Sequence, residues 1–211
     1  MSTNTTATDR ISARLLAAGA AAGPLYVVVS LVEVVTREGF DPTRHAWSML
    51  ANGGPGWIHR TNLIVSGVLV ILGAVGLSRA LRSRWAPALL GLYGLGMVGG
   101  GIFAADPGRG FPVGTPEVVP VSASGALHFV CGGIGFVGLI AACFVLARRL
   151  RAEDHRRLAT FSRVTGVAFA VGFVVMGATG GQAWSLLAFT AAVILASAWL
   201  TTVFLHYSKN N

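Results

Sequence analysis

The segment "GALHFVCGGIGFVGLIAACFVLA", Gly125–Ala147, decides the fold class of this chain. Apart from His128 near its start, it consists of apolar and small residues. A helix needs about 20 apolar residues to cross the hydrocarbon core of a bilayer, so the segment predicts a transmembrane helix. Only 11% of the 211 residues are charged, against about one quarter in soluble domains. The whole chain therefore has a membrane composition.

Five further apolar runs extend this interpretation. The expected spans are Leu15–Val35, Ile58–Ser78, Ala86–Ala105, Gly125–Ala147, Val164–Thr179 and Ala183–Leu205. We predict an all-α integral membrane protein, a bundle of six transmembrane helices. Residues 1–14 and 206–211 would be short tails around a single membrane domain, residues 15–205. Four tryptophans fall at expected interfaces and predict an aromatic belt: Trp47, Trp57, Trp85 and Trp184.

Basic residues gather in alternate connections, which is the pattern that places them on the cytoplasmic side. Twelve of the 16 follow it: Arg10, Arg14, Arg79, Arg82, Arg84, Arg148, Arg149, Arg151, Arg156, Arg157, Arg163 and Lys209. We therefore expect a multi-pass protein of the cytoplasmic membrane, with both termini cytoplasmic and one sizeable cytoplasmic loop before the fifth span. The net charge of +8 fits this topology and contact with anionic lipid. No basic-aromatic module suggests nucleic acid as a partner.

The chain contains the sequence Asp-Pro-x-Arg twice, in "FDPTRHAWS" (Phe40–Ser48) and "AADPGRGFP" (Ala104–Pro112). Each copy follows an apolar run, and a later histidine, His59 or His128, opens the next span. Each arginine could pair with the aspartate of its own copy or turn to a ligand. A true duplication would make spans one and two a parallel repeat of spans three and four, and transporters often bind between repeats. One shared site would bring Asp106 and His128 within hydrogen-bonding or water-bridged reach of each other or of Arg44 or Arg109.

Polar residues also recur at helical spacing along the expected spans. The faces are Tyr26, Ser30, Glu33 and Arg37 in the first span, His59, Asn62 and Ser66 in the second, and His128, Cys131 and Gly132 in the fourth. Such stripes point into a bundle rather than at lipid. The i,i+4 order of Glu33 and Arg37 favours a salt bridge. Together these patterns predict an outward-facing polar pocket between the first four helices.

Three functions fit this pocket. In the first, Arg44 and Arg109 hold the anionic head of a small amphipathic or lipid-like ligand, and the polar side chains around them are His45, Ser48, His59 and Asn62. In the second, the protein is a cofactor-free acid–base enzyme on a lipid or isoprenoid, similar in outline to membrane terpenoid cyclases, with Glu33, Asp106 and His128 as catalytic groups. In the third, it is a structural or assembly partner.

Other features narrow the possible cofactors and partners. No HxxxH or HExxH spacing is present, so neither a metal nor another cofactor is predicted. The glycine-rich runs Gly94–Gly101 and Gly132–Gly138 favour close helix packing, within the chain or in a homo-oligomer. The expected partners are membrane lipid and a small hydrophobic or amphipathic ligand.

Three stretches resemble a known bacterial membrane family, the domain of unknown function 998. They are "FDPTRHAWSMLANGGPGWIHRTNLIVSGVLVILGAVGL", "GGGIFAADPGRGFPVGTP" and "ALHFVCGG". The motifs that carry the resemblance are Ser48 before "GPGW", Asn62 in the second span, "FxxDPxxGxP" after the third, and the histidine that opens the fourth. The resemblance implies six spans and a bacterial, actinobacterial-type inner-membrane protein. It implies no particular activity.

Overall fold

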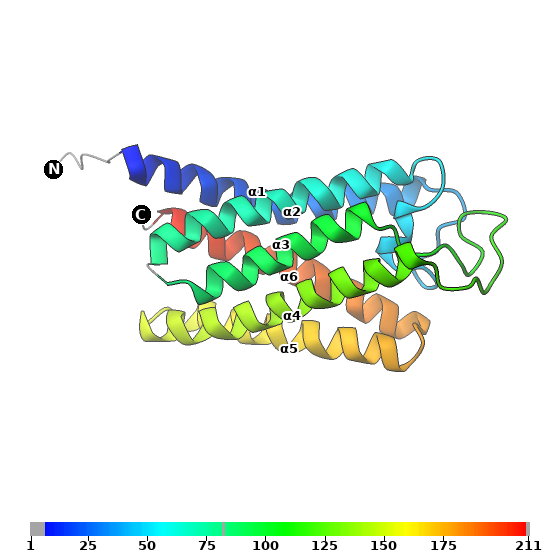
Figure 1. The fold of residues 1–211 in the computed structure, drawn as a ribbon. Helices are drawn as coiled ribbons and strands as arrows, with labels where there is room; N and C mark the ends of the chain where they lie inside the picture. Colours follow the sequence, from blue (N-terminus) through cyan, green and yellow to red (C-terminus); the bar gives the residue numbers. More distant parts are fainter. Residues whose placement is uncertain (1–6, 82, 210–211) are drawn as a thin grey trace.

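The computed structural model describes residues 7–81 and 83–209. Six α-helices account for most of them: α1 (Ala7–Thr36), α2 (Gly56–Leu81), α3 (Trp85–Ile102), α4 (Ala123–Ala152), α5 (Arg156–Ala178) and α6 (Ala183–Lys209). A short 3-10 helix, η1 (Trp47–Ala51), lies between α1 and α2. All six helices are long and apolar enough to cross a membrane, and the described residues form no β-strand (Figure 1). The predicted six-helix membrane fold is confirmed.

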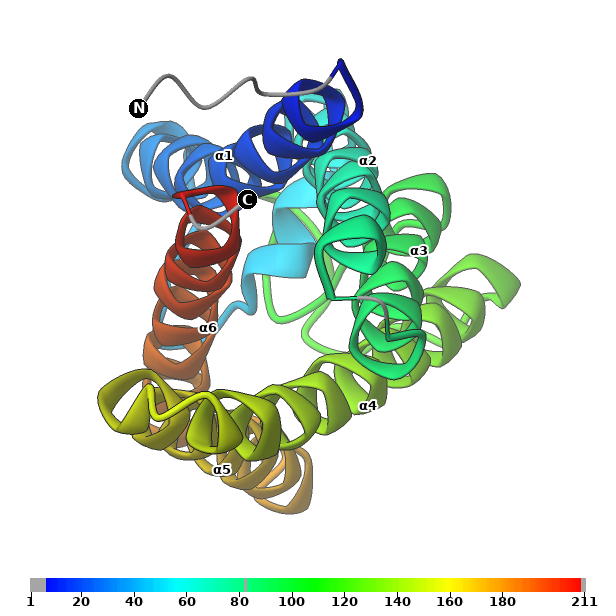
Figure 2. The ribbon, with the colours of Figure 1, turned by 90° about the vertical axis from the view of Figure 1, so that its left-hand side faces the viewer.

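The helices form a ring. Each packs against the next in sequence, and α6 closes the ring against α1 (Figure 2). One end of the bundle, here called the loop end, carries the three connections 37–55, 103–122 and 179–182. The opposite end, the terminal end, carries the start of α1, the turn at 153–155 and the end of α6 (Figure 1). Because lipid supplies no hydrogen bonds, the irregular backbone is confined to these two ends.

Several helices have bounds that differ clearly from the expected spans. Helices α1 and α5 each begin eight residues before the expected span. The apolar run marks only the part of a helix that crosses the membrane, and the helix itself can extend beyond the bilayer. The expected loop before the fifth span is therefore only the turn 153–155. Helix α3 ends at Ile102 rather than Ala105. Pro107 disfavours helical backbone at Asp106. The Ala104 carbonyl has a partner outside α3, because it accepts a hydrogen bond from the Ser124 hydroxyl at 3.0 Å.

Glycines allow the helices to approach closely, as predicted. A Cβ on Gly96 of α3 would lie 2.7 Å from the Cα of Gly135 in α4. Gly19 of α1 and Gly73 of α2 meet in the same way. Any side chain at these positions would push two helices apart. At these positions glycine is used between helices of one chain, whereas a Cβ on Gly132 or Gly133 would meet nothing within 4 Å.

A second packing cluster lies under the loops. Trp47 and Leu50 of η1 pack with Phe111 of the 103–122 loop, and all three are buried. Trp47 is therefore not part of a lipid-facing belt, because η1 folds back into the mouth of the bundle. The other three expected belt residues, Trp57, Trp85 and Trp184, are more than half exposed.

Candidate functional site

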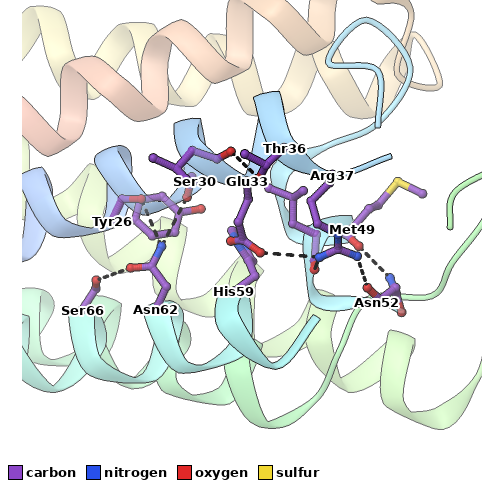
Figure 3. Close-up of polar contacts among 12 residues, drawn as sticks. Tyr26, Ser30, Glu33, Thr36, Arg37, Met49, Asn52, His59, Asn62 and Ser66 are labelled. Carbon is purple, nitrogen blue, oxygen red and sulfur yellow. Dashed lines mark hydrogen bonds and ion pairs between the residues drawn. The ribbon is translucent and has the colours of Figure 1, made fainter. Parts of the chain in front are cut away.

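Two charged residues and a histidine meet inside the loop end of the bundle (Figure 3). Glu33 of α1 places one carboxylate oxygen 2.9 Å from Nδ1 of His59 in α2 and the other 3.5 Å from Nη1 of Arg37. The Glu33 and Arg37 side chains are 4% and 8% exposed, and His59 is fully buried. The predicted i,i+4 salt bridge is formed. The histidine partner comes from the facing helix.

Arg37 connects this buried acid to both long loops. Its guanidinium donates to the backbone carbonyls of Leu50, at 2.9 Å, and of Asn52. It also lies 5.3 Å above the ring of Phe111 in the 103–122 loop. The positive charge is therefore held by an acid, two carbonyl oxygens and an aromatic face. Arg37 fixes η1 and the 103–122 loop over the end of α1.

The α1–α2 interface contains a second polar group one turn deeper. Asn62 donates to the Tyr26 carbonyl at 3.1 Å and to the Ser30 hydroxyl at 3.4 Å, and it accepts from Ser66 (Figure 3). The two predicted stripes do face each other. Among the described residues, however, His59 Nε2 is buried without a hydrogen-bond partner.

The two Asp-Pro-x-Arg copies lie against each other at the loop end. Arg44 donates to the Arg109 carbonyl at 3.3 Å, and Arg109 donates to the Arg44 carbonyl at 3.4 Å. His45 completes the contact, because its Nδ1 accepts the Asp41 N–H at 2.9 Å and its Nε2 lies 3.0 Å from the Arg109 carbonyl. A carbonyl can only accept, so the neutral His45 ring carries its proton on Nε2.

Within the described residues, neither aspartate pairs with the arginine of its own copy. Asp41 accepts from the Thr43 amide and hydroxyl, and these bonds hold the pKa of its carboxyl below the usual range. Asp106 accepts from the amide and hydroxyl of Ser122, the N-cap residue of α4. The aspartates bond to a turn and to a helix N-cap close by in the chain, and the alternative in which each pairs with its own arginine is not formed.

The two arginines find other partners. Arg44 pairs with Glu117 at 2.8 Å, at side-chain exposures of 52% and 66%. Arg109 donates to the carbonyls of Gly180 and Gly181 in the α5–α6 connection. Its own backbone has a φ of 53°, a left-handed conformation that is uncommon outside glycine. Arg109 therefore joins three loops and carries backbone strain, which often accompanies function.

A cavity of about 430 Å³ opens inside the ring beneath these loops. All six helices contribute to its wall, with η1 and the 103–122 loop at its mouth. The wall is mainly aromatic and aliphatic, including Tyr26, Trp47, Met49, Tyr93, Met97, Phe129, Phe136, Phe169, Phe173, Met176 and Phe189. Ionisable side chains gather near its loop end: Asp106, Arg109, Glu117 and His128. The arrangement is an apolar chamber with a charged rim.

The rim histidine has a defined tautomer. His128 Nδ1 lies 3.1 Å from the Gly100 carbonyl and 2.8 Å from the Phe103 carbonyl. Both are acceptors, so Nδ1 carries the proton and Nε2 of the neutral ring keeps a lone pair. The described residues make no hydrogen bond or ion pair between Asp106 and His128, Arg44 or Arg109. The two copies do approach each other, but through Arg44, Arg109 and His45.

The predicted site residues therefore divide into two groups. Ser48, Asp106, Arg109 and His128 line the cavity. Glu33, Arg44, His45, His59 and Asn62 are not among its lining residues; they hold the surrounding helices and loops. The pocket is not confined to the first four helices, because α5 and α6 complete its wall. Glu117 and the aromatic residues of α5 and α6 also line the cavity but were not among the predicted site residues. For α5, the i,i+4 spacing of Phe169 and Phe173 was the signal that the sequence offered.

Comparison with known proteins supplies a family. No curated protein and no solved structure matches this chain. One family model, described as "Protein of unknown function (DUF998)", matches residues 20–206. Because the match covers most of the chain, including all of α2 to α5, the protein belongs to the DUF998 family.

Proposed function

We propose that this protein binds a small amphipathic ligand, with its apolar part inside the ring of helices and its polar head at the loop end. The cavity carries this proposal. Its volume of about 430 Å³ falls within the range of about 300–1,000 Å³ that is usual for small-molecule sites. Apolar walls with a few polar groups at one end match a molecule that has one apolar and one polar part.

The rim favours a head with a single negative charge. The Arg109 guanidinium rests on neutral carbonyls and is paired with no carboxylate among the described residues, so its charge is available to a ligand. The nearby Arg44–Glu117 pair is exposed and therefore weak. Asp106 and Glu117 on the same rim would repel a second negative charge. A carboxylate or a phosphodiester has the required charge.

The direction of the opening follows from charge. Arg149, Arg151, Arg156 and Arg157 lie at the terminal end, which by the positive-inside rule faces the cytoplasm. The loop end, and with it the rim of the cavity, would then face the outer side of the cytoplasmic membrane. Ligand would enter from that side or from the outer leaflet.

A head-group series tests the proposal. The protein in nanodiscs of zwitterionic lipid is loaded with a fluorescent long-chain carboxylate, which is then displaced with palmitate, hexadecanol or hexadecylamine. We expect palmitate to act at a concentration at least about tenfold lower than the alcohol, since one extra charge-assisted contact provides about that factor. Arg109→Gln should remove this preference. Arg60→Gln is the matched control, because Arg60 also donates to two carbonyls at the loop end but lies outside the cavity.

Two results would contradict the proposal. Equal displacement by all three compounds would show that the site does not distinguish the charge of the head group. If none of the three compounds displaced the probe, the cavity would not bind a simple amphipathic ligand.

The His128 tautomer favours a second candidate function, acid–base chemistry in the same cavity. A lone pair on Nε2 can accept a proton from a bound substrate, while Asp106 lies on the same rim. Glu33 is not among the residues that line the cavity, so it takes no part in this acid–base reaction. Incubation with a linear isoprenoid alcohol such as geranylgeraniol tests it. A product of unchanged mass and altered retention, lost in His128→Asn, would establish an isomerase or cyclase; unchanged substrate would exclude that reaction for this alcohol.

A further inference from the structure

The terminal end holds a second group of chemically active side chains. Glu153, His155 and His206 each place a possible ligand atom within 4.8 Å of the other two. They come from the end of α4, the α4–α5 turn and the last turn of α6, so the fold brings together residues that lie far apart in sequence. The rings of His155 and His206 meet edge to face, with centroids 4.5 Å apart.

The backbone presents His155 for this contact. Helix α4 ends with the bonds Asp154 N–H to Arg151 O and His155 N–H to Leu150 O, the Schellman arrangement. Its left-handed position is filled by Asp154, with φ at 59°, where glycine is usual. His155 is the N-cap residue of α5, but its side chain makes no capping bond. The ring is turned to His206 instead.

The carboxylate is also held in place. Arg149 donates to one Glu153 oxygen at 2.7 Å, and the Tyr207 hydroxyl donates to the other at 3.1 Å. Carboxylates that bind metals are commonly oriented by hydrogen bonds of this kind. Each carboxylate oxygen has two lone pairs, so the oxygen bonded to Tyr207 keeps one for a metal ion.

We propose that Glu153, His155 and His206 bind Zn²⁺ at the terminal end of the bundle. Two imidazoles and one carboxylate are a ligand set used by zinc, with water in the fourth position. Tetrahedral geometry places ligand atoms about 3.3 Å apart, so no pair of these ligand atoms, all within 4.8 Å of one another, needs to close by more than roughly an ångström and a half. Glu153 and His155 are exposed and His206 is partly exposed, so a shift of this size does not require the packed interior of the bundle to rearrange.

The four ligands would include one negative charge beside several arginines, which favours a transition metal over calcium or magnesium. Imidazole nitrogen suits zinc and its neighbours, whereas calcium and magnesium require a set of oxygen ligands. A bound ion would join α4, α5 and α6 at this end. The site is separate from the cavity at the loop end and does not depend on the ligand proposed there.

The experiment uses the full chain, purified in detergent without a histidine tag and freed of metal. Zn²⁺ is titrated by calorimetry, and Co²⁺ serves as a spectroscopic substitute whose visible absorption reports tetrahedral coordination. We expect one equivalent of Zn²⁺ to bind and its Kd to rise at least about tenfold in both His155→Ala and His206→Ala. His128→Ala is the matched control, because that histidine lies at the opposite end, and it should bind as the wild type does.

Unfolding temperatures check that the variants remain folded and supply a second measurement. Zn²⁺ should raise the Tm of the wild type and of His128→Ala but leave that of His155→Ala unchanged. Binding that is unchanged in both His155→Ala and His206→Ala would overturn the proposal, as would a wild type that takes up no Zn²⁺ at micromolar concentration.

Discussion

Replacing Arg37 with methionine should destabilise the protein far more than its position near the end of α1 suggests. The side chain of Glu33 is 4% exposed, and Arg37 is its cationic partner at 3.5 Å. Removal of one member of a buried ion pair costs about 3–5 kcal/mol, because the remaining charge is left uncompensated. The carbonyls of Leu50 and Asn52 lose their donor in the same step. We therefore expect the free energy of unfolding to fall by about 3–5 kcal/mol.

The control is Arg60→Met. Arg60 also donates to two carbonyls, those of Gly101 at 3.1 Å and Ile102 at 2.9 Å, but it neutralises no buried acid. Its loss should cost about 1–2 kcal/mol. Reversible unfolding by titration of mixed micelles with dodecyl sulfate measures both values. In the Arg37→Met background, Glu33→Gln should restore part of the stability, because it removes the stranded charge. Equal costs for the two arginines, or no restoration by Glu33→Gln, would refute this account of the network.

Three further predictions concern packing, topology and the rim. Gly96→Ala should cost about 1–3 kcal/mol of folding free energy in the same unfolding assay, because its Cβ would enter α4, whereas Gly91→Ala meets nothing and should be neutral. A reporter fused to the C-terminus should be active only in the cytoplasm and one inserted at Val113 only outside; the reverse pattern would invert the proposed orientation. Asp106→Asn should remain folded, since the amide keeps one acceptor for Ser122, and should strengthen binding of the anionic probe, because a negative charge is removed from the rim; unchanged binding would make Asp106 a purely structural cap.

The helices and one ion pair could be predicted because they depend on local sequence. Hydrophobic length alone identifies a transmembrane segment. Glu33 and Arg37 face each other for the same reason that any i,i+4 pair does. The repetition of Asp-Pro-x-Arg left open whether the two copies would meet. They do meet, although each aspartate accepts hydrogen bonds from Thr43 or Ser122 instead of binding arginine. Residue spacing does not show whether a carboxylate will bond to a nearby backbone N–H group or to an arginine elsewhere in the chain.

The cavity itself could not be predicted in full. Phe169 and Phe173 of α5 look like lipid-facing residues in the sequence, because lipid and an apolar chamber select the same side chains. Their role appears only once α6 closes the ring against α1. The group of Glu153, His155 and His206 was missed for a related reason. His206 meets the other two only through the packing of α6 beside the α4–α5 turn, and no motif search detects such a pairing.

If ligand binds in the space inside the ring, as proposed above, a side chain that fills this space should abolish binding. Gly132 lines the cavity one turn after His128, and a Cβ added there would meet no atom within 4 Å. Gly132→Leu can therefore occupy the cavity without straining the helices. Gly91 is equally unobstructed but does not line the cavity, so Gly91→Leu is the matched control.

The measurement is binding of the fluorescent long-chain carboxylate to both variants in nanodiscs, with unfolding followed in parallel. We predict that Gly132→Leu keeps wild-type stability and loses the probe, while Gly91→Leu keeps both. Wild-type binding of the probe to a folded Gly132→Leu protein would contradict the claim.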